Sequence, residues 1–424
     1  MNLKLTKKEK SWILYDVGNS AFILLVSTII PIYFNSLAES GGLSSVEYLA
    51  YWGYAASAAT LIVALLGPVL GTLADTKGFK KPLFLLSLLV GLIACVSMGL
   101  AKQWLAFLVI FLIAKIGYSG SIIFYDSMLS DVTTEDRMDH VSSQGYAWGY
   151  IGSCIPFAVC LLLVLGSGSI GISMTVAMAL SFVITALWWL GMTVPLLRNY
   201  QQKYYVEPQK HAVAESFRRI GRTFKNIRNE KRIFVFLLAF FFYIDGVYTF
   251  IDMATAYGSA LGLGSTGLLL ALLVTQLVAF PCCIIFGRLS AKYPGDILIT
   301  ICIAAYLGIT VFAMSLTTQL QFWILAVLVG MFQSGIQALS RSYFTKIIPA
   351  EQSGEYFGFL DICGKGASFV GTAIVSIVSQ LTGDISKGVG MIALLFLIGI
   401  ILFRYSVKLN ENVLAAADSG KKNF

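Results

Sequence analysis

Apolar stretches long enough to cross a lipid bilayer follow one another along most of this chain. A helix needs about 20 apolar residues to span the hydrocarbon core. Runs of this kind in the first half of the chain lie at 12–36, 48–73, 82–101, 104–130, 143–165 and 172–197. A second set follows at 232–258, 265–290, 296–316, 321–346, 354–381 and 388–408. This pattern predicts twelve transmembrane helices in two sets of six.

The spacing of these runs divides the chain into four parts. We expect an N-terminal six-helix bundle at 1–197, a linker at 198–231, a C-terminal six-helix bundle at 232–408 and a frayed cytoplasmic tail at 409–424. In the linker, apolar residues recur every three or four positions among arginines and lysines, which predicts a basic amphipathic helix. The mean hydropathy of +0.80 agrees with an all-α, polytopic membrane protein and excludes a soluble one.

Basic residues favour one side of the predicted membrane. Of the thirty lysines and arginines, only Lys102 and Lys387 fall in the connections on one side, and only Lys115 and Lys365 lie deep within spans. The positive-inside rule therefore predicts a protein of the cell membrane with both termini in the cytoplasm. Anionic lipids of the inner leaflet can then balance the net charge of +8, so no nucleic-acid partner is expected.

The residue types used in metal and catalytic sites are sparse or dispersed. The seven cysteines all lie in apolar segments without metal-type spacing, and the two histidines stand alone in polar loops. No nucleophile motif occurs, nor the Gly-x-x-x-x-Gly-Lys sequence of an ATP-binding loop. We therefore expect neither an enzyme nor a primary pump, and neither a metal nor a cofactor.

A short motif occurs twice, half a chain apart. The segment GTLADTKG at 71–78 has a degraded counterpart, GRLSAKYPG, at 287–295, as in transporters built from two parallel repeats. The longer segment GPVLGTLADTKGFKK at 67–81 resembles the signature loop of the major facilitator superfamily. That resemblance implies a cytoplasmic gate in which Gly71 permits close helix approach and Asp75 faces the N-terminal end of the helix at 354–381. The candidate gate residues are Gly71, Asp75, Lys77, Gly78, Lys81 and Arg341; the alternative is a plain basic turn.

Four further segments carry a narrower resemblance. They are LYDVGNSAF at 14–22, YIDGVYT at 243–249, QALSRS at 337–342 and EYFG at 355–358. Together they resemble the vacuolar amino-acid effluxers of autophagy and their bacterial relatives, over nearly the whole chain. The resemblance implies the twelve-helix fold and the export of a small solute. The family pattern has a proline after Gly371, where this chain has Thr372. The resemblance therefore does not predict whether that helix bends.

Ionisable side chains interrupt several of the predicted spans. Those inside helices are Asp16, Lys115, Asp126, Asp245, Asp252, Asp361 and Lys365. In the superfamily that the chain resembles, the helices that hold them line or flank a central cavity. Lys115 and Asp245 lie near the middle of their spans, where an unpaired charge costs about 2.5 to 3.5 kcal/mol. We expect both to act directly in transport, with a structural ion pair as the alternative.

The other candidates for binding a substrate or ion are open to two interpretations. Asp16 and Asn19 share one helix face, which indicates a polar cavity wall or an interfacial carboxylate near a helix N-terminus. Asp361 and Lys365 have the spacing of a helical ion pair, which serves as a structural bridge or contacts substrate. The remaining candidates line the cavity or hold helices together: Tyr118, Gln276, Gln333, Gln337 and Arg341, the last three along one face.

The function that these features favour is secondary active transport. We expect a small-molecule substrate, a polar solute such as an amino acid, exported by alternating access and coupled to a proton or sodium ion by a monomeric protein. The aromatic-rich helices are also typical of an exporter of drugs or amphiphiles, and the Gln and Asn side chains are also typical of a sugar transporter. Both functions remain alternatives. A receptor or scaffold is less favoured, because the charges gather in cavity helices and the central loop is short.

Overall fold

The computed structural model describes residues 4–207, 230–260, 263 and 265–421. Long helices dominate both halves of the described chain. Those of the N-terminal half are α1 (Lys7–Ser40), α2 (Ser45–Ala74), α3 (Lys80–Met98), α4 (Trp104–Ser127), α5 (Leu129–Val132), α6 (Met138–Leu165), α7 (Ser167–Ile170) and α8 (Met174–Asn199), with the 3-10 turn η1 (Glu135–Arg137). Those of the C-terminal half are α10 (Lys231–Ala260), α11 (Ser265–Leu289), α12 (Gly295–Met314), α13 (Gln319–Ile347), α14 (Ser353–Thr382), α15 (Ile385–Gly390) and α16 (Ile392–Lys421), with η2 (Ala350–Gln352).

The predicted membrane spans are present. Eleven helices in the described part of the chain are long and apolar enough to cross a membrane. The predicted span at 354–381 corresponds to α14, a 30-residue helix with an apolar stretch at Val370–Thr382. The all-α, two-bundle fold expected from the pattern is therefore confirmed.

Local sequence explains where several of these helices begin. Thr6 and Glu9 bond reciprocally to each other's backbone N–H and form a capping box at the start of α1. Ser44 and Glu47 form the same arrangement at the start of α2. Thr318 and Gln321 do so for α13. These polar pairs satisfy backbone donors that no intrahelical carbonyl can reach.

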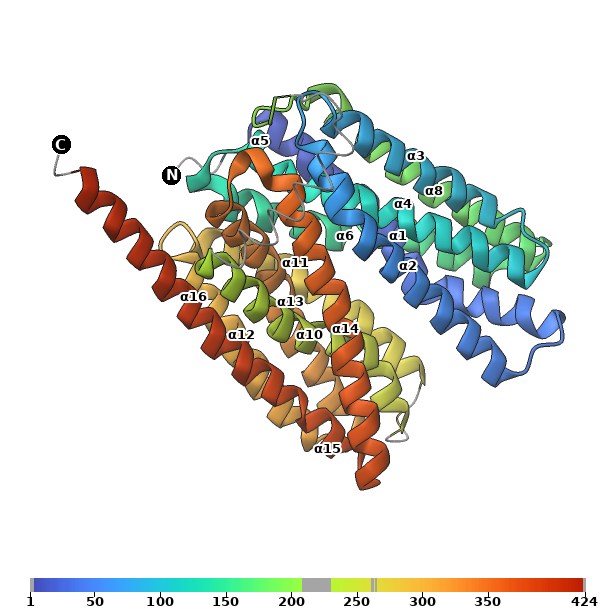
Figure 1. Ribbon diagram of the computed structural model, residues 1–424. Coiled ribbons are helices and arrows are strands. Elements are labelled where there is room, and N and C mark those ends of the chain that lie inside the picture. The colour runs from blue at the N-terminus through green and yellow to red at the C-terminus, as the bar shows by residue number, and fades with distance from the viewer. Residues whose placement is uncertain (1–3, 208–229, 261–262, 264, 422–424) are drawn as a thin grey trace.

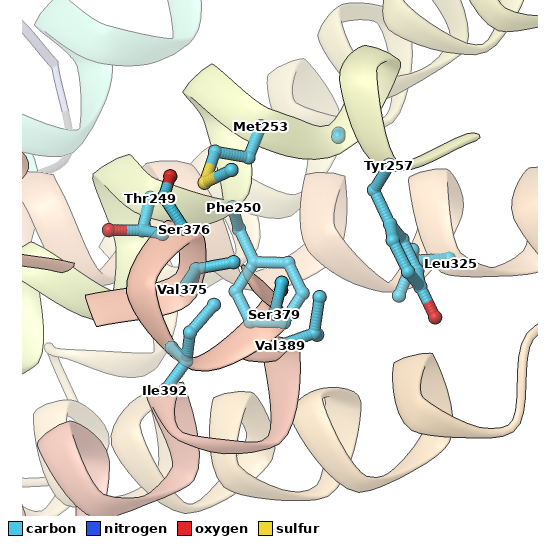
Figure 2. Close-up of a pocket in the computed structure, with 11 residues that line it drawn as sticks. Thr249, Phe250, Met253, Tyr257, Leu325, Val375, Ser376, Ser379, Val389 and Ile392 are labelled. Carbon is cyan, nitrogen blue, oxygen red and sulfur yellow. The ribbon is translucent and has the colours of Figure 1, made fainter. Parts of the chain in front are cut away.

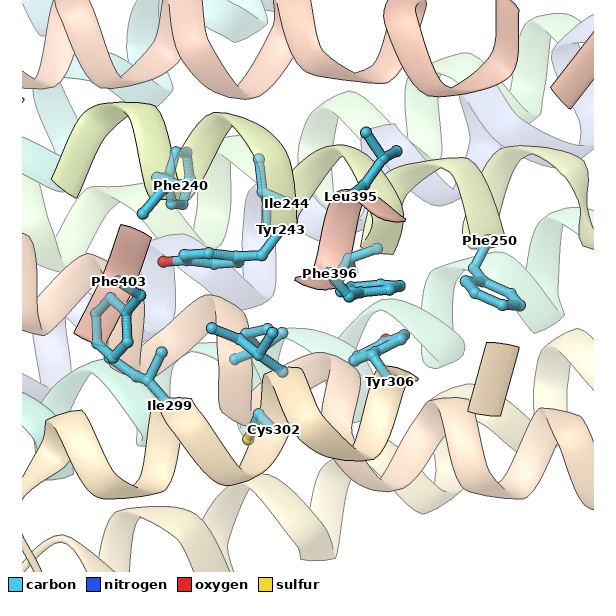
Figure 3. Packing of buried hydrophobic residues seen from close by; sticks show 14 of the residues in the cluster. Phe240, Tyr243, Ile244, Phe250, Ile299, Cys302, Tyr306, Leu395, Phe396 and Phe403 are labelled. Atoms are coloured by element: carbon cyan, nitrogen blue, oxygen red, sulfur yellow. The ribbon is translucent and has the colours of Figure 1, made fainter. Parts of the chain in front are cut away.

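Each half has its own apolar core. One cluster of buried side chains is built from the N-terminal helices and includes Trp12, Phe22, Phe107 and Trp189. The other belongs mainly to the C-terminal helices, and Figure 3 shows part of it around Tyr243, Tyr306, Phe396 and Phe403. A much smaller buried cluster, Ala147, Cys283 and Ala338, joins the halves. The two bundles are thus separately packed bodies in contact.

The halves meet near the chain termini. In Figure 1 both termini lie at the upper left, where the helices of the two halves converge, while the opposite ends of the halves diverge. We call the contact near the termini the terminal seam; it joins α2 to α14, and α6 to α11 and α13. If the termini are cytoplasmic, as the basic residues predict, this conformation is closed to the cytoplasm.

The internal repeat reappears in the packing of the terminal seam. A Cβ on Gly71 of α2 would overlap the backbone of Gly354 in α14. Its counterpart Gly287 of α11 faces α6, where a Cβ would lie 2.8 Å from the Cβ of Ser143. Both glycines therefore let a helix of one half approach a helix of the other closely.

The tail of the predicted domain organisation differs from the structure, and most of the linker lies outside the described residues. The segment expected to be a frayed tail from residue 409 is helical as far as Lys421, because α16 continues without a break and its end is rich in alanine, the best helix former. The frayed-tail expectation is therefore wrong for 409–421. The basic helix expected in the linker falls at 208–229, outside the described residues.

Candidate functional site

The contact between α2 and the start of α14 forms one side of the terminal seam. Asp75, which follows the last residue of α2, is fully buried. Its Oδ1 accepts a hydrogen bond from the N–H of Gly354 at 2.8 Å, and its Oδ2 accepts one from the N–H of Glu355 at 3.0 Å. These N–H groups belong to the first turn of α14, where an intrahelical acceptor is lacking. The expected pairing of Asp75 with this helix N-terminus is present.

The lysine at this contact is Lys80, which was not among the predicted gate residues. Its side chain is fully buried, and its Nζ lies 3.8 Å from Asp75 Oδ1, 3.6 Å from Asp131 Oδ2 and 3.0 Å from Ser353 Oγ. Lys81 is exposed. Lys77 is also exposed and pairs with Glu207 at 3.3 Å.

The loop glycine of the motif has a local structural role. Gly78 has a φ of +80°, a conformation that favours glycine, and its N–H donates to Gln202 Oε1 at 2.9 Å. The glycine therefore shapes the loop within the N-terminal half. Of the motif residues predicted at the gate, only Gly71 and Asp75 have described contacts with the C-terminal half.

The burial of Asp75 makes its protonation sensitive to the conformation of the seam. Burial raises the pKa of this carboxyl from 3.8 to about 7, and Lys80 and the two N–H groups of α14 act in the opposite direction. If the seam opened, water would reach the carboxyl and its pKa would return toward the ordinary value. A closed seam would then bind a proton more readily than an open one.

Lowering the pH from 8 to 6 is expected to shift the seam about tenfold toward the closed conformation, through the one proton that Asp75 takes up. Cys283 reports the shift, because its thiol is buried in the seam and donates to the carbonyl oxygen of Ser143 at 3.1 Å. A protein that retains only this cysteine should react more slowly with maleimide at pH 6. Each rate is divided by that of Asp75→Asn at the same pH, which removes the direct effect of pH on the thiol. An unchanged ratio would contradict the prediction.

The guanidinium of Arg341 forms the centre of the terminal seam. Arg341 lies on α13 of the C-terminal half and is 4% exposed. Its Nη1 lies 3.0 Å from Asp126 Oδ1, and its Nη2 lies 3.5 Å from Asp16 Oδ2. Its Nε donates to Ser142 Oγ at 2.9 Å. All three partners belong to the N-terminal half, so Arg341 joins the two halves; its role in a gate stays a prediction.

Asp139 provides a second charged contact across the seam. This residue of α6 accepts a hydrogen bond from Ser342 Oγ at 2.6 Å and pairs with Lys346 Nζ at 2.7 Å, both from α13. Ser142, one turn along α6, donates to the carbonyl oxygen of Ala338 at 2.7 Å. The face of α6 toward α13 is therefore polar over most of its terminal turns.

The polar face of α13 continues toward the middle of the protein. Tyr150 of α6 donates from its hydroxyl to Gln337 Oε1 at 2.7 Å and accepts a hydrogen bond from Gln333 Nε2 at 3.1 Å. The i, i+4, i+8 stripe of Gln333, Gln337 and Arg341 is therefore the surface that α13 presents to the N-terminal half. In this conformation the stripe holds helices together.

Asp245 lies in α10 against α14 and is fully buried. Its Oδ1 accepts hydrogen bonds from the N–H of Gly371 at 2.9 Å and from Thr249 Oγ1 at 3.3 Å. A Cβ on Gly371 would overlap both of these oxygen atoms, so glycine lets α14 lie against the carboxyl. The other oxygen, Oδ2, is buried without a hydrogen-bond partner among the described residues. Within the described part of the structure, half of this carboxyl therefore lacks the stabilisation that a buried charge needs.

Two adjoining cavities in the C-terminal half lie near this carboxyl. The larger, of about 260 Å³, has a mostly apolar lining that includes Thr249, Phe250, Met253 and Tyr257 (Figure 2). The smaller, of about 70 Å³, shares Phe250 with it and is also lined by Gln276 and Gln333. Sequence reasoning placed a binding site between the halves, whereas these cavities are lined by the C-terminal half alone.

The remaining candidates are dispersed. Asn19 is buried and donates to Asp16 Oδ1 at 3.3 Å, so the predicted shared face is real. Tyr118 packs against the rings of Phe22 and Trp189 in the N-terminal core. The Oε1 of Gln276 is buried without a hydrogen-bond partner among the described residues.

The cationic and acidic candidates in the middle of the spans are only partly described. Lys115 is half-buried, with its Nζ 6.0 Å from the centre of the Phe111 ring. Asp361 is half-buried as well. The side chains of Lys365 and Asp252 lie outside the described part of the structure.

Several residues of the seam escaped the sequence reasoning. Asp126 carried a signal, as an ionisable residue inside a span, but its place near a helix end made it a weaker candidate. Lys80 is followed directly by Lys81, and nothing in the local sequence indicates which of the two lysines is buried. The others had no signal in a single sequence, since aromatic and polar residues are common at helix ends: Trp12, Tyr125, Asp139, Tyr146 and Tyr150.

Comparison with known proteins gives consistent matches along the chain. A family model described as "Vacuole effluxer Atg22 like" matches residues 5–139 and 130–416. An MFS-type transporter of Bacillus subtilis, YxiO, is 43% identical over 410 residues, which cover 96% of each chain. Autophagy-related protein 22 of Coccidioides immitis is 25% identical over 63% of this chain, and the match spans 48% of that protein.

A solved structure shares the architecture. The human organic anion transporter MFSD10 superposes with a TM-score of 0.70 and 13% sequence identity, over 94% of this chain and 100% of that one. A likeness at this level of identity concerns the fold alone. It agrees with the all-α, two-bundle fold of this chain.

Proposed function

The chain belongs to the Atg22-like effluxer family of major facilitator superfamily transporters, and on this premise we propose that it exports a small polar solute, such as an amino acid. Transport proceeds by alternating access between the two halves and is coupled to a proton or sodium ion. The distribution of lysine and arginine supports a place in the cell membrane with both termini in the cytoplasm.

The observation that carries this proposal is the chemistry of the terminal seam. Charged and hydrogen-bonding groups of both halves meet there, around Asp75, Asp139 and Arg341, while each half keeps its own apolar core. Water can replace such polar contacts when the halves part, whereas opening an extended apolar contact exposes hydrophobic surface. A seam of this kind suits a gate that opens and closes.

Asp245 is the group that we assign to ion coupling. Its carboxyl lies at the middle of α10, with one oxygen held by Gly371 and Thr249 and the other without a hydrogen-bond partner among the described residues. A proton or cation on Oδ2 would remove the cost of a buried charge at this depth. Thr249 also lines the larger cavity. Binding of a proton or cation to the carboxyl can therefore alter the shape of that cavity and the packing of α10 on α14.

Replacement of Asp245 by asparagine is expected to uncouple transport. The amide keeps the acceptor for Gly371 and stays neutral at every pH, so it cannot take up or release the coupling proton. In proteoliposomes loaded with a mixture of amino acids, exchange across the membrane should continue. Accumulation driven by a pH or sodium gradient should fall at least about tenfold, as expected when one ion no longer contributes its driving force.

The matched control for this experiment is Glu135→Gln, which neutralises an exposed carboxylate of the N-terminal half. Full, gradient-driven accumulation by Asp245→Asn would remove this residue from the coupling mechanism. Parallel reactions with sugars and with amphiphilic dyes test the two other solute classes, and transport of these in place of amino acids would overturn the proposed substrate class.

A further inference from the structure

The Arg341 guanidinium is enclosed by aromatic rings of the N-terminal half. Its central carbon lies 4.6 Å from the ring centre of Trp12, 4.3 Å from that of Tyr146 and 5.5 Å from that of Tyr125. These rings come from α1, α6 and α4. Aromatic faces attract organic cations, because the face of the ring carries partial negative charge. A residue of one half is therefore held as a ligand by the other half.

Two carboxylates complete the enclosure. Asp126 and Asp16 both contact the same guanidinium, at 3.0 Å and 3.5 Å. The N–H groups of Arg341 also donate to the hydroxyl and to the carbonyl oxygen of Ser142, at 2.9 Å and 3.0 Å. Two acidic groups thus share one cation from the C-terminal half, which leaves the enclosure with an excess of negative charge.

The enclosure is held together by bonds that do not involve Arg341. Tyr125 donates from its hydroxyl to Asp16 Oδ2 at 2.9 Å, and Asn19 donates to Asp16 Oδ1 at 3.3 Å. Trp12 donates from its ring N–H to the carbonyl oxygen of Tyr125 at 3.0 Å, and the two rings stack with centres 4.4 Å apart. The N-terminal half can therefore keep this geometry after Arg341 leaves.

Space inside the enclosure depends on one glycine. A Cβ on Gly145 of α6 would lie 2.7 Å from Asp16 Oδ2 and 3.2 Å from Arg341 Nη2. Any larger residue would therefore fill the space that the guanidinium occupies. Glycine at this position keeps room for a planar cation between the rings and the carboxylates.

We propose that this enclosure, the cation cage of Trp12, Asp16, Tyr125, Asp126 and Tyr146, binds the cationic ammonium or guanidinium group of the transported solute when the terminal seam is open. The inference rests on the proposed transport function, since opening of the seam withdraws Arg341 on α13. Two carboxylates would then stand unpaired beside aromatic faces, and an organic cation satisfies both. On closure, Arg341 returns and displaces the solute from the cage.

The cage is tested directly by removing the Arg341 guanidinium, which occupies it in the closed conformation. Arg341→Ala should leave a site that binds methylguanidinium saturably, as followed by tryptophan fluorescence of the purified protein, and at least about tenfold more tightly than the neutral isostere N-methylurea. Adding Tyr146→Leu should weaken that binding about tenfold, while Trp12 stays in place as the fluorescent reporter. The matched control is Lys346→Ala, which removes a lysine of the same helix whose described partner is the Asp139 carboxylate; it should bind methylguanidinium at least about tenfold more weakly than Arg341→Ala, because Arg341 still occupies the cage.

The wild-type sequence gives an independent measurement if Arg341→Ala does not fold. A cation that enters the cage only after Arg341 has left must hold the seam open. Methylguanidinium should therefore accelerate maleimide labelling of the protein that retains only Cys283, and N-methylurea or sodium chloride should not. Equal effects of the cation and of N-methylurea, or no effect of either, would overturn the proposal. Both measurements detect cation binding in the absence of transport. A failure of the proposed export activity can therefore be distinguished from a failure of the proposed cation cage.

Discussion

Replacing Gly71 by leucine is expected to prevent the terminal seam from closing. A Cβ at this position would overlap the carbonyl oxygen of Gly354 and would lie 2.6 Å from its carbonyl carbon. The obstacle is backbone, which no change of rotamer can move. Overpacking of this kind costs about 3 kcal/mol, which corresponds to roughly a hundredfold change in the ratio of closed to open protein.

The measurement is again the labelling of Cys283, which should accelerate by about that factor in Gly71→Leu. Gly53→Leu is the matched control, because Gly53 lies in the same helix and has nothing within 4 Å of the position of a Cβ. Its labelling rate should equal that of the parent protein. Slow labelling of Gly71→Leu would mean that α2 and α14 can separate without opening the seam around Cys283.

Replacing Lys80 by methionine is expected to lower the stability of the protein strongly. The change removes the cation that Asp75 and Asp131 share at 3.8 Å and 3.6 Å, and leaves both carboxylates buried near each other. Removal of one partner from a buried ion pair costs about 3 to 5 kcal/mol. For a bundle of this size the apparent melting temperature should fall by roughly 6 to 20 °C.

The neighbouring lysine provides the control. Lys81→Met changes the same residue type one position along the chain, on an exposed side chain, and should shift the melting temperature little. The double variant Lys80→Met, Asp75→Asn should recover part of the loss, because it removes one of the unpaired charges. If Lys80→Met and Lys81→Met melt at the same temperature, the buried ion pair does not stabilise the closed protein.

Much of the fold followed from local properties of the chain. The apolar runs predicted the spans closely, as in α3, expected at 82–101 and observed at Lys80–Met98. The tail is the exception, because its polar residues predict fraying whereas its alanines favour helix. The motif resemblance placed Gly71 and Asp75 at the contact between α2 and the start of α14, where they lie.

The candidate site could be predicted only in part. Sequence reasoning identified Asp16 and Asp245 as residues that need partners inside a membrane, because their chemistry is costly there. It placed Asp16 with a substrate and Arg341 with the gate, whereas the structure brings both into one cluster with Asp126. The position of Asp245 Oδ2, which has no hydrogen-bond partner in the described part of the chain, could not be inferred either, because it depends on how α10 and α14 pack.

The sequence by itself determined the class of protein, the helices and their order, the repeat and the residue types that cannot remain unpaired in lipid. These properties depend on composition and on a helical period that is local to each segment. Only the tertiary structure decided that Lys80 is buried while Lys81 is exposed, and that Arg341 lies among aromatic rings of the other half. Such contacts depend on the rotation of each helix and on the approach of two separately packed bundles, and residues more than 200 positions apart meet there without a local signal.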